Sequence, residues 1–181
     1  MDKTIDQYNH VISLCSDVYH NKMKDYGTAW RILRPSSVTD QIYIKANRIR
    51  SIEMKGVQKV EDDFKAEFIG IVNYSIMAII QLELGLSENP DLEAEKAGEL
   101  YVRYFEKARG LMEDKNHDYD EAWRLMRISS YTDLILMKIN RIKQIEDNQG
   151  RTLVSEGIDA SYYDMINYAV FALIKLEFNE Q

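Results

Sequence analysis

Cationic side chains recur at a fixed spacing in two distant parts of the sequence. Lys45 and Arg48 lie three residues apart, and Lys138 and Arg141 repeat that spacing. Residues three apart share one face of a helix, so each pair presents two cations together. Arginine can bind a phosphate or carboxylate through two hydrogen bonds, while lysine acts as a point charge. The two pairs therefore predict an anion-binding face in each half of the chain.

Tryptophans lie close to these cations in the sequence. Trp30 is followed by Arg31, and Trp123 by Arg124. An indole can stack on a nucleobase or on a guanidinium group. In the alternative interpretation, the cations pair with carboxylates inside the protein and bind no ligand. The candidate ligand-binding residues are Trp30, Arg31, Lys45, Arg48, Asn73, Trp123, Arg124, Lys138, Arg141 and Asn167.

Two asparagines in this set occupy apolar surroundings. Asn73 and Asn167 are each flanked by Ile, Val, Tyr or Met. A buried amide destabilises the fold unless it is hydrogen-bonded. The partner can be Lys45, Arg48, a backbone carbonyl or a ligand, and the sequence leaves these alternatives open.

Carboxylates at helical spacing suggest a metal site. Asp63 and Glu67 lie four residues apart, and Glu156 and Asp164 lie eight apart. Such pairs can hold Mg²⁺ with water completing the octahedron. Acids near the start of a helix also complement its dipole without any metal. Asp63, Glu67, Glu156 and Asp164 are thus candidate Mg²⁺ ligands, and Mg²⁺ is the only cofactor the sequence suggests.

Several classes of function are excluded or disfavoured. Cys15 is the only cysteine, so neither an intrachain disulfide nor a zinc site built on several thiolates can form. The sequence has no Ser-His-Asp order and no glycine-rich phosphate loop. The net charge of −7 opposes direct binding to duplex nucleic acid.

The longest nearly apolar run, 71–80, is too short to span a membrane, and residues 1–10 lack a secretory signal. We expect a cytoplasmic protein without membrane contact.

The sequence contains an internal repeat. Asp25-Tyr26-Gly27-Thr28-Ala29-Trp30-Arg31 is answered 93 residues later by Asp118-Tyr119-Asp120-Glu121-Ala122-Trp123-Arg124, and 17 of the 29 positions from 25 to 53 are identical. After one inserted residue, Asn73-Tyr74 returns as Asn167-Tyr168. This predicts two copies of one unit, 1–87 and 88–181, joined near Pro90 and packed as one body.

Each unit is predicted to contain three main helices. The first spans about 4–23 and 92–114, the second opens at the Ser37-Val38-Thr39-Asp40 and Ser130-Tyr131-Thr132-Asp133 capping patterns, and the third spans about 61–84 and 156–178. Gly27, replaced by Asp120, predicts a left-handed residue after the first helix. The third helices are apolar on most sides and should bury each other. We predict an all-α, pseudo-twofold helical bundle built from two tandem three-helix repeats.

The motifs from Asp25-Tyr26 through Lys45-x-x-Arg48 to Asn73-Tyr74, present once per copy, resemble the nucleotide-modification-associated domain family. That family occurs in phages and Bacteroidetes-like bacteria and is linked to DNA base modification. Its members carry acids at four-residue steps before the Asn-Tyr pair; here Ala160 interrupts the steps in the second copy, and Ala66 and Gly70 in the first. The all-α nucleoside triphosphate pyrophosphatases are a distant analogy, since they place Glu-x-x-Glu where this chain has Lys45-x-x-Arg48.

Two functions therefore stand side by side. The resemblance and the cations favour binding or processing of a small phosphate-bearing nucleotide, with Mg²⁺ from helix-three acids. The alternative is a non-catalytic helical interaction module whose Lys, Arg, Asn and acid network fixes helix register. Whether the protein is an enzyme is left open, and a homo-oligomer is compatible with both.

Overall fold

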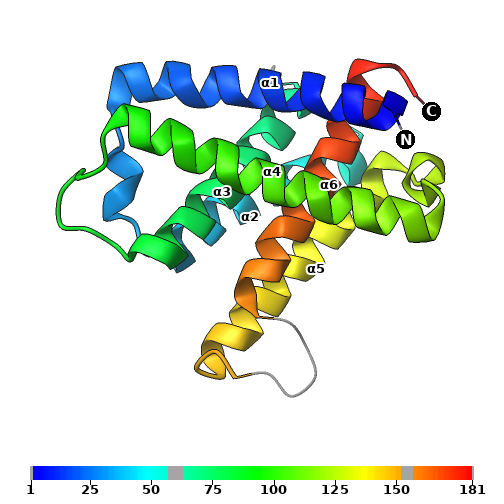
Figure 1. Cartoon of the computed structure of the whole chain (residues 1–181). Helices are drawn as coiled ribbons and strands as arrows, with labels where there is room; N and C mark the ends of the chain where they lie inside the picture. Colours follow the sequence, from blue (N-terminus) through cyan, green and yellow to red (C-terminus); the bar gives the residue numbers. More distant parts are fainter. Residues whose placement is uncertain (1, 57–62, 152–156, 181) are drawn as a thin grey trace.

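The computed structural model describes residues 2–56, 63–151 and 157–180, and within them the chain is helical without a strand. The elements are α1 (Asp2–Tyr26), η1 (Ala29–Ile32), α2 (Pro35–Lys55), α3 (Phe64–Leu84), α4 (Ala94–Tyr119), η2 (Ala122–Leu125), α5 (Ile128–Asp147) and α6 (Ile158–Glu177) (Figure 1). The order α1-η1-α2-α3 returns as α4-η2-α5-α6. The predicted all-α tandem repeat is confirmed.

The helices pack in three layers, and a pseudo-twofold axis relates the two copies. Helices α3 and α6 form the most extensive helix contact of the molecule, and α2 and α5 cover them on one side while also touching each other. On the other side, α1 and α4 each contact both α3 and α6; in Figure 1, α1 runs along the top and α4 crosses in front of the central helices. Each first helix thus contacts the central helices of both copies.

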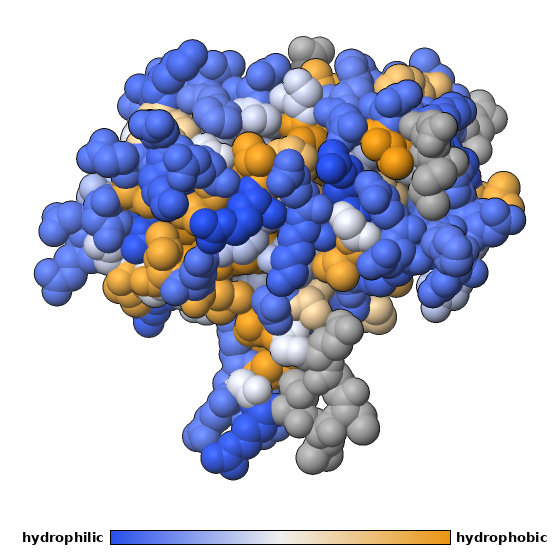
Figure 2. Space-filling view, in the orientation of Figure 1, coloured by the Kyte–Doolittle hydropathy of each residue, from blue (hydrophilic) through white to orange (hydrophobic). Residues whose placement is uncertain are grey.

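The apolar third helices form the core, as predicted. Ile71, Ile76 and Ile80 of α3 and Ile166 and Ile174 of α6 are fully buried. By length and composition α3 is the one helix among the described residues that could cross a membrane, but 67% of its apolar window is buried inside the protein. It is a core helix of the bundle. Polar side chains cover most of the face shown in Figure 2, with apolar side chains between them.

The turn after the first helix follows the prediction. Gly27 has φ 59°, and Asp120 at the matching position has φ 51°. Both lie in the left-handed region, which glycine adopts freely and aspartate tolerates. This turn directs the chain away from α1 and α4 into short 3₁₀ turns, which carry the two tryptophans and were not predicted.

The predicted capping patterns are wrong. Helix α2 begins at Pro35 after an extended Arg34, and α5 begins at Ile128 after an extended Arg127, with no side-chain cap in either case. Proline suits the first helical position because it lacks the amide that would be unsatisfied there. Ser37 and Ser130 therefore lie within the first turn of their helices. The acids of the patterns instead face the other copy.

Those acids form loose ion pairs between the second helices. The Asp40 Oδ1 atom lies 3.9 Å from Lys143 Nζ, and Asp133 Oδ1 lies 3.8 Å from Arg50 Nε. The two pairs are equivalent under the repeat, so α2 and α5 meet antiparallel. All four side chains are about half exposed, and such pairs stabilise a protein by about 0–1 kcal/mol.

Candidate functional site

An aromatic pocket of about 160 Å³ opens in the first copy beside Trp30. The end of α1, the Gly27 turn, η1 and α3 contribute its walls. The left-handed turn brings η1 back against α3, and Tyr74 and Met77 share a face of α3 because they are three residues apart. The lining residues are Tyr19, Lys22, Met23, Tyr26, Gly27, Ala29, Trp30, Tyr74 and Met77.

One cationic side chain lines this pocket, and a second lies close to one of its rings. Lys22 lines it, is exposed, and forms no ion pair or hydrogen bond with the described residues. Lys45 Nζ lies 5.9 Å from the ring centroid of Tyr74 and 3.5 Å from Glu67 Oε2. Arg48 Nη1 lies 2.5 Å from Glu67 Oε1. The structure therefore brings the predicted Lys45 and Arg48 together, and one nearly buried carboxylate faces both.

Gly70 allows Lys45 to reach that carboxylate. A Cβ atom at position 70 would lie 2.5 Å from Lys45 Cε and 2.6 Å from its Cδ. Real Cβ atoms essentially never approach so closely, so any other residue would displace the lysine side chain. The lysine thus crosses the surface of α3 over Gly70 to Glu67, one turn earlier.

The equivalent tryptophan of the second copy is enclosed. Trp123 is only 5% exposed, and the ring of Phe171 stacks on it with centroids 4.4 Å apart and an interplanar angle of 8°. The guanidinium carbon of Arg124 lies 4.4 Å from the Trp123 ring centroid. Phe171 and Arg124 thus cover the indole.

A carboxylate occupies the cationic region of the second copy. Asp164 Oδ1 accepts a hydrogen bond of 2.6 Å from Lys115, and its Oδ2 lies 2.7 Å from Lys138 Nζ. Burial opposes ionisation of Asp164, but the hydrogen bonds from both lysines outweigh it and lower its pKa. Arg141 is half-buried and has no ion pair among the described residues, because Ser161 stands where the first copy has Glu67.

Arg31 is a structural anchor in the first copy. It is 3% exposed and donates to Asp91 Oδ1 at 2.9 Å, to the Gly85 carbonyl at 2.6 Å and to the Gln81 side chain. Gln81 in turn donates to the Arg31 carbonyl at 3.0 Å. Arg31 thereby ties η1 to the end of α3 and to the linker between the copies.

Arg124, its equivalent, anchors the chain ends. It donates to Glu121 at 2.9 Å, to Glu180 at 2.6 Å and to the Thr4 hydroxyl at 2.6 Å. Burial alone would raise the pKa of Glu180. Hydrogen bonds from Lys3 and Gln7 and the charge of Arg124 outweigh burial and lower the pKa to about 2. The donors of both arginines are thus engaged within the chain.

The two asparagines bond across the copies. Asn73 donates to the Cys15 carbonyl of its own copy at 3.0 Å and accepts from the Tyr101 hydroxyl of the other copy at 2.8 Å. Asn167 mirrors it, donating to the Ala108 carbonyl at 2.9 Å and accepting from the Tyr8 hydroxyl at 2.9 Å. Both amides are 5% exposed, so the hydrogen-bonding needs foreseen for them are met by the protein.

The candidate metal ligands lie in different settings. Asp63 caps α3 by accepting from the Lys65 amide at 3.1 Å, while Glu67 and Asp164 are paired with cations. Glu156 lies outside the described residues. Across the described chain, no three His, Cys, Asp or Glu side chains come close enough to hold a metal ion together. Mg²⁺ binding stays a prediction.

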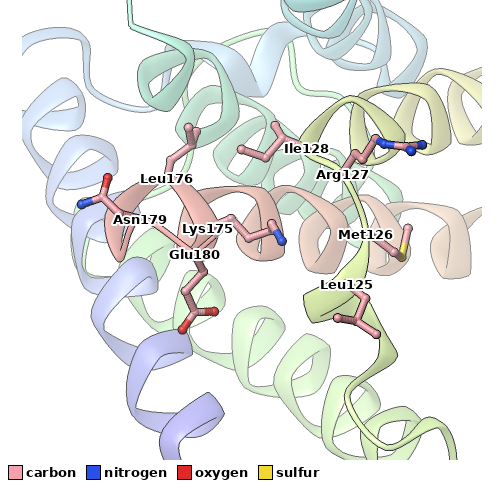
Figure 3. Close-up of a pocket in the computed structure, with 8 residues that line it drawn as sticks. All are labelled: Leu125, Met126, Arg127, Ile128, Lys175, Leu176, Asn179 and Glu180. Carbon is pink, nitrogen blue, oxygen red and sulfur yellow. The ribbon is translucent and has the colours of Figure 1, made fainter.

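A larger pocket, of about 400 Å³, lies between η2 and the end of α6 (Figure 3). Leu125, Met126, Ile128 and Leu176 contribute apolar walls. It has no aromatic ring, and Lys175 already donates to the Arg124 carbonyl at 2.7 Å. Arg127 also lines it, is exposed and has no ion pair among the described residues. The pocket beside Trp30 is the stronger candidate because it combines aromatic rings with a cation.

Sequence reasoning missed Lys22, Tyr26 and Met77 as lining residues of that pocket. It also missed Lys115 and Phe171, which fill the matching region of the second copy. The repeat itself contained the signal, because Met77 aligns with Phe171 and Gly70 with Asp164 at an offset of 94. Differences between copies of a repeat mark positions where their sites diverge.

Comparison with known proteins gives one family. The sequence pattern of nucleotide modification associated domain 1 matches residues 22–82 and again residues 115–176. Each match runs from the end of a first helix through the third helix and includes the tryptophan, the paired cations and the asparagine. No curated protein and no solved structure matches the chain.

Proposed function

Because the chain belongs to the nucleotide modification associated domain 1 family, we propose that it binds a nucleotide in the pocket beside Trp30. The base lies against the indole ring, and the phosphate lies between Lys22 and Lys45. The observation that supports this most is the open aromatic pocket with an unpaired lysine in its wall.

The lining side chains suit a nucleobase. Stacking on an aromatic residue is worth about 1–3 kcal/mol per base. Tyr26 and Tyr74 add hydroxyl groups that can donate to or accept from the polar edge of a base. The described walls contain aromatic, methionine and lysine side chains, which favour recognition of a ring over nucleophilic catalysis.

The charges favour a nucleoside monophosphate. The proposed phosphate faces two ammonium groups, that of Lys22 in the pocket wall and that of Lys45 beside the Tyr74 ring. A phosphate monoester carries about −1.5 to −2 at pH 7. A triphosphate would require further cations, which Mg²⁺ could supply. The proposed ligand is therefore a nucleoside monophosphate that binds without metal.

Thermal denaturation with added ligand tests the proposal. Nucleoside monophosphates at about 100 times their Kd should stabilise the protein by about 2.7 kcal/mol. For a chain of this size that corresponds to a rise in Tm of about 5–10 °C. Triphosphates with and without Mg²⁺, nucleosides and inorganic phosphate are measured in parallel to separate base, phosphate and metal contributions.

Matched variants locate the effect. Lys22→Ala should reduce the rise in Tm, whereas Lys115→Ala, at the equivalent position of the second copy, should lower the starting Tm but keep the rise. Equal responses in both variants, or a flat response of the wild type to every compound, would count against the proposal.

A second candidate is a non-catalytic interaction module. The pairing of Lys45 and Arg48 with Glu67, and the internal bonds of both asparagines, support it. Under this candidate the ionic network fixes helix register and no nucleotide changes the Tm. The same titration separates the two functions.

A further inference from the structure

Two differences between the copies lie at or near the tryptophan and its neighbouring lysines. Where the first copy has Met77, the second has Phe171, which stacks on Trp123 at 4.4 Å. Where the first copy has Gly70, the second has Asp164. One change places a ring over the indole. The other places a carboxylate between two lysines at the position where, in the first copy, the Lys45 side chain crosses Gly70 to Glu67.

The aromatic change places a ring parallel to the indole. The interplanar angle of 8° between Phe171 and Trp123 is that of a stacked pair. A nucleobase on a protein tryptophan adopts the same kind of contact. Phe171 comes from α6, within the chain, so the ring is always present at this site.

The charge change places an anion between two lysines. Lys115 and Lys138, the equivalents of Lys22 and Lys45, lie 2.6 and 2.7 Å from the two carboxylate oxygens of Asp164. A phosphate between Lys22 and Lys45 would make the same kind of charge-assisted hydrogen bonds. The two differences lie at separate positions of the sequence, and each puts a group of the chain where part of a nucleotide would bind.

We propose that the second copy carries an internal mimic of the ligand, in which Phe171 replaces the base and Asp164 replaces the phosphate. The inference rests on nucleotide binding beside Trp30 and adds two statements to it. The chain binds one ligand, in the first copy only. The bound pose in that copy follows the arrangement of Phe171 and Asp164 in the second.

In the first copy, one lysine and the tryptophan lack the partners that Asp164 and Phe171 supply in the second. Lys22 has no ion pair among the described residues, whereas Lys115 is held at 2.6 Å from Asp164. Trp30 is half-buried beside a pocket, whereas Trp123 is 5% exposed. The second copy is then a structural partner that completes the bundle without ligand.

Exchange of the differing residues tests the inference by isothermal titration with AMP, GMP, CMP and UMP. The wild type should bind one equivalent of at least one of them. Gly70→Asp combined with Met77→Phe should close the first site and weaken binding at least 100-fold. Asp164→Gly combined with Phe171→Met should open the second site and raise the stoichiometry to two.

A matched control uses the same substitutions away from the site. Gly110→Asp on α4, where an added Cβ meets nothing within 4 Å, is combined with Met137→Phe at an exposed position of α5. This variant should bind one equivalent with unchanged affinity. Circular dichroism of every variant reports whether it folds.

The outcomes separate the inference from the proposed function. If the wild type binds none of the four compounds, the proposed function fails and the inference fails with it. If the wild type binds two equivalents, or the closed first copy still binds normally, nucleotide binding stands and the inference is overturned. Should the opened variant not fold, the closed variant and the wild-type stoichiometry alone decide the matter.

Discussion

Tyr101 and Asn73 form a buried hydrogen bond that joins the two copies, and its removal has a calculable cost. The Tyr101 hydroxyl lies 2.8 Å from Asn73 Oδ1, and the residues are 0% and 5% exposed. Burial raises the pKa of Tyr101 well above its usual value, so the phenol stays protonated and donates. Tyr101→Phe leaves the amide oxygen without this donor, at a cost of about 1–3 kcal/mol.

The mirror pair supplies an internal replicate. Tyr8 donates to Asn167 at 2.9 Å in the same geometry, so Tyr8→Phe should cost a similar amount. Asn73→Ala removes both of its bonds and leaves a small cavity, for about 2–4 kcal/mol. The double variant with Tyr101→Phe should cost less than the sum of the single changes, since both delete one shared bond.

Urea denaturation followed by circular dichroism measures these effects. The copies share a core, so we expect one cooperative transition whose midpoint falls while its slope stays constant. Tyr119→Phe, at a side chain 70% exposed, is the control and should change stability by less than about 0.5 kcal/mol. Tyr101→Phe and Tyr8→Phe variants as stable as this control would refute the role assigned to these bonds, and two separate transitions would refute the shared core.

Three further predictions concern charge, packing and the repeat. Glu180 has a folded-state pKa of about 2, below its ordinary 4.5, so its contribution to folding stability is present above pH 4.5 and lost as pH falls toward 2. Glu180→Gln should therefore lower the free energy of unfolding by about 1–2 kcal/mol at pH 7 and by almost nothing at pH 2. Urea denaturation at several pH values across this range measures the difference. Gly70→Ala should displace Lys45 from Glu67, yet change stability by less than about 1 kcal/mol in urea denaturation, because alanine favours the helix by a similar amount. Residues 1–87 alone should fail to fold as a monomer, because α3 loses its contact with α6; a monomeric, cooperatively melting fragment in calorimetry and sedimentation would contradict this.

The sequence was sufficient to predict the architecture, because the repeat and the apolar third helices impose it. A helix with Ile71, Ile76 and Ile80 buried at 0% needs partners on several sides, and the second copy is the available one. The left-handed turn at Gly27 was also predictable, since its equivalent Asp120 is a residue that tolerates that conformation.

The helix starts were misjudged because two signals competed. Ser37 and Asp40 have the spacing of a capping box, but Pro35 begins the helix two residues earlier. Local patterns of this kind do not reveal that Asp40 faces Lys143 of the other copy, because the two residues are about a hundred positions apart in the sequence.

Two cations and one ring of the candidate site were predicted, but neither Lys22 nor the difference between the copies was. Lys45, Arg48 and Trp30 were identified from spacing and residue type. That Phe171 stacks on Trp123, while Met77 leaves Trp30 open, depends on which faces of α3 and α6 meet the 3₁₀ turns. Arg31 and Arg124 were assigned to a ligand, whereas their donors are engaged by Asp91, Glu180 and their neighbours, which are distant in sequence.

A crystal structure of the chain grown with a nucleoside monophosphate tests the central claim most directly. We expect density for one ligand per chain, with its base parallel to the Trp30 indole and its phosphate within about 3 Å of the Lys22 and Lys45 ammonium groups. Density beside Trp123 with Phe171 displaced, or a nucleotide bound elsewhere while the pocket beside Trp30 holds only water, would contradict it.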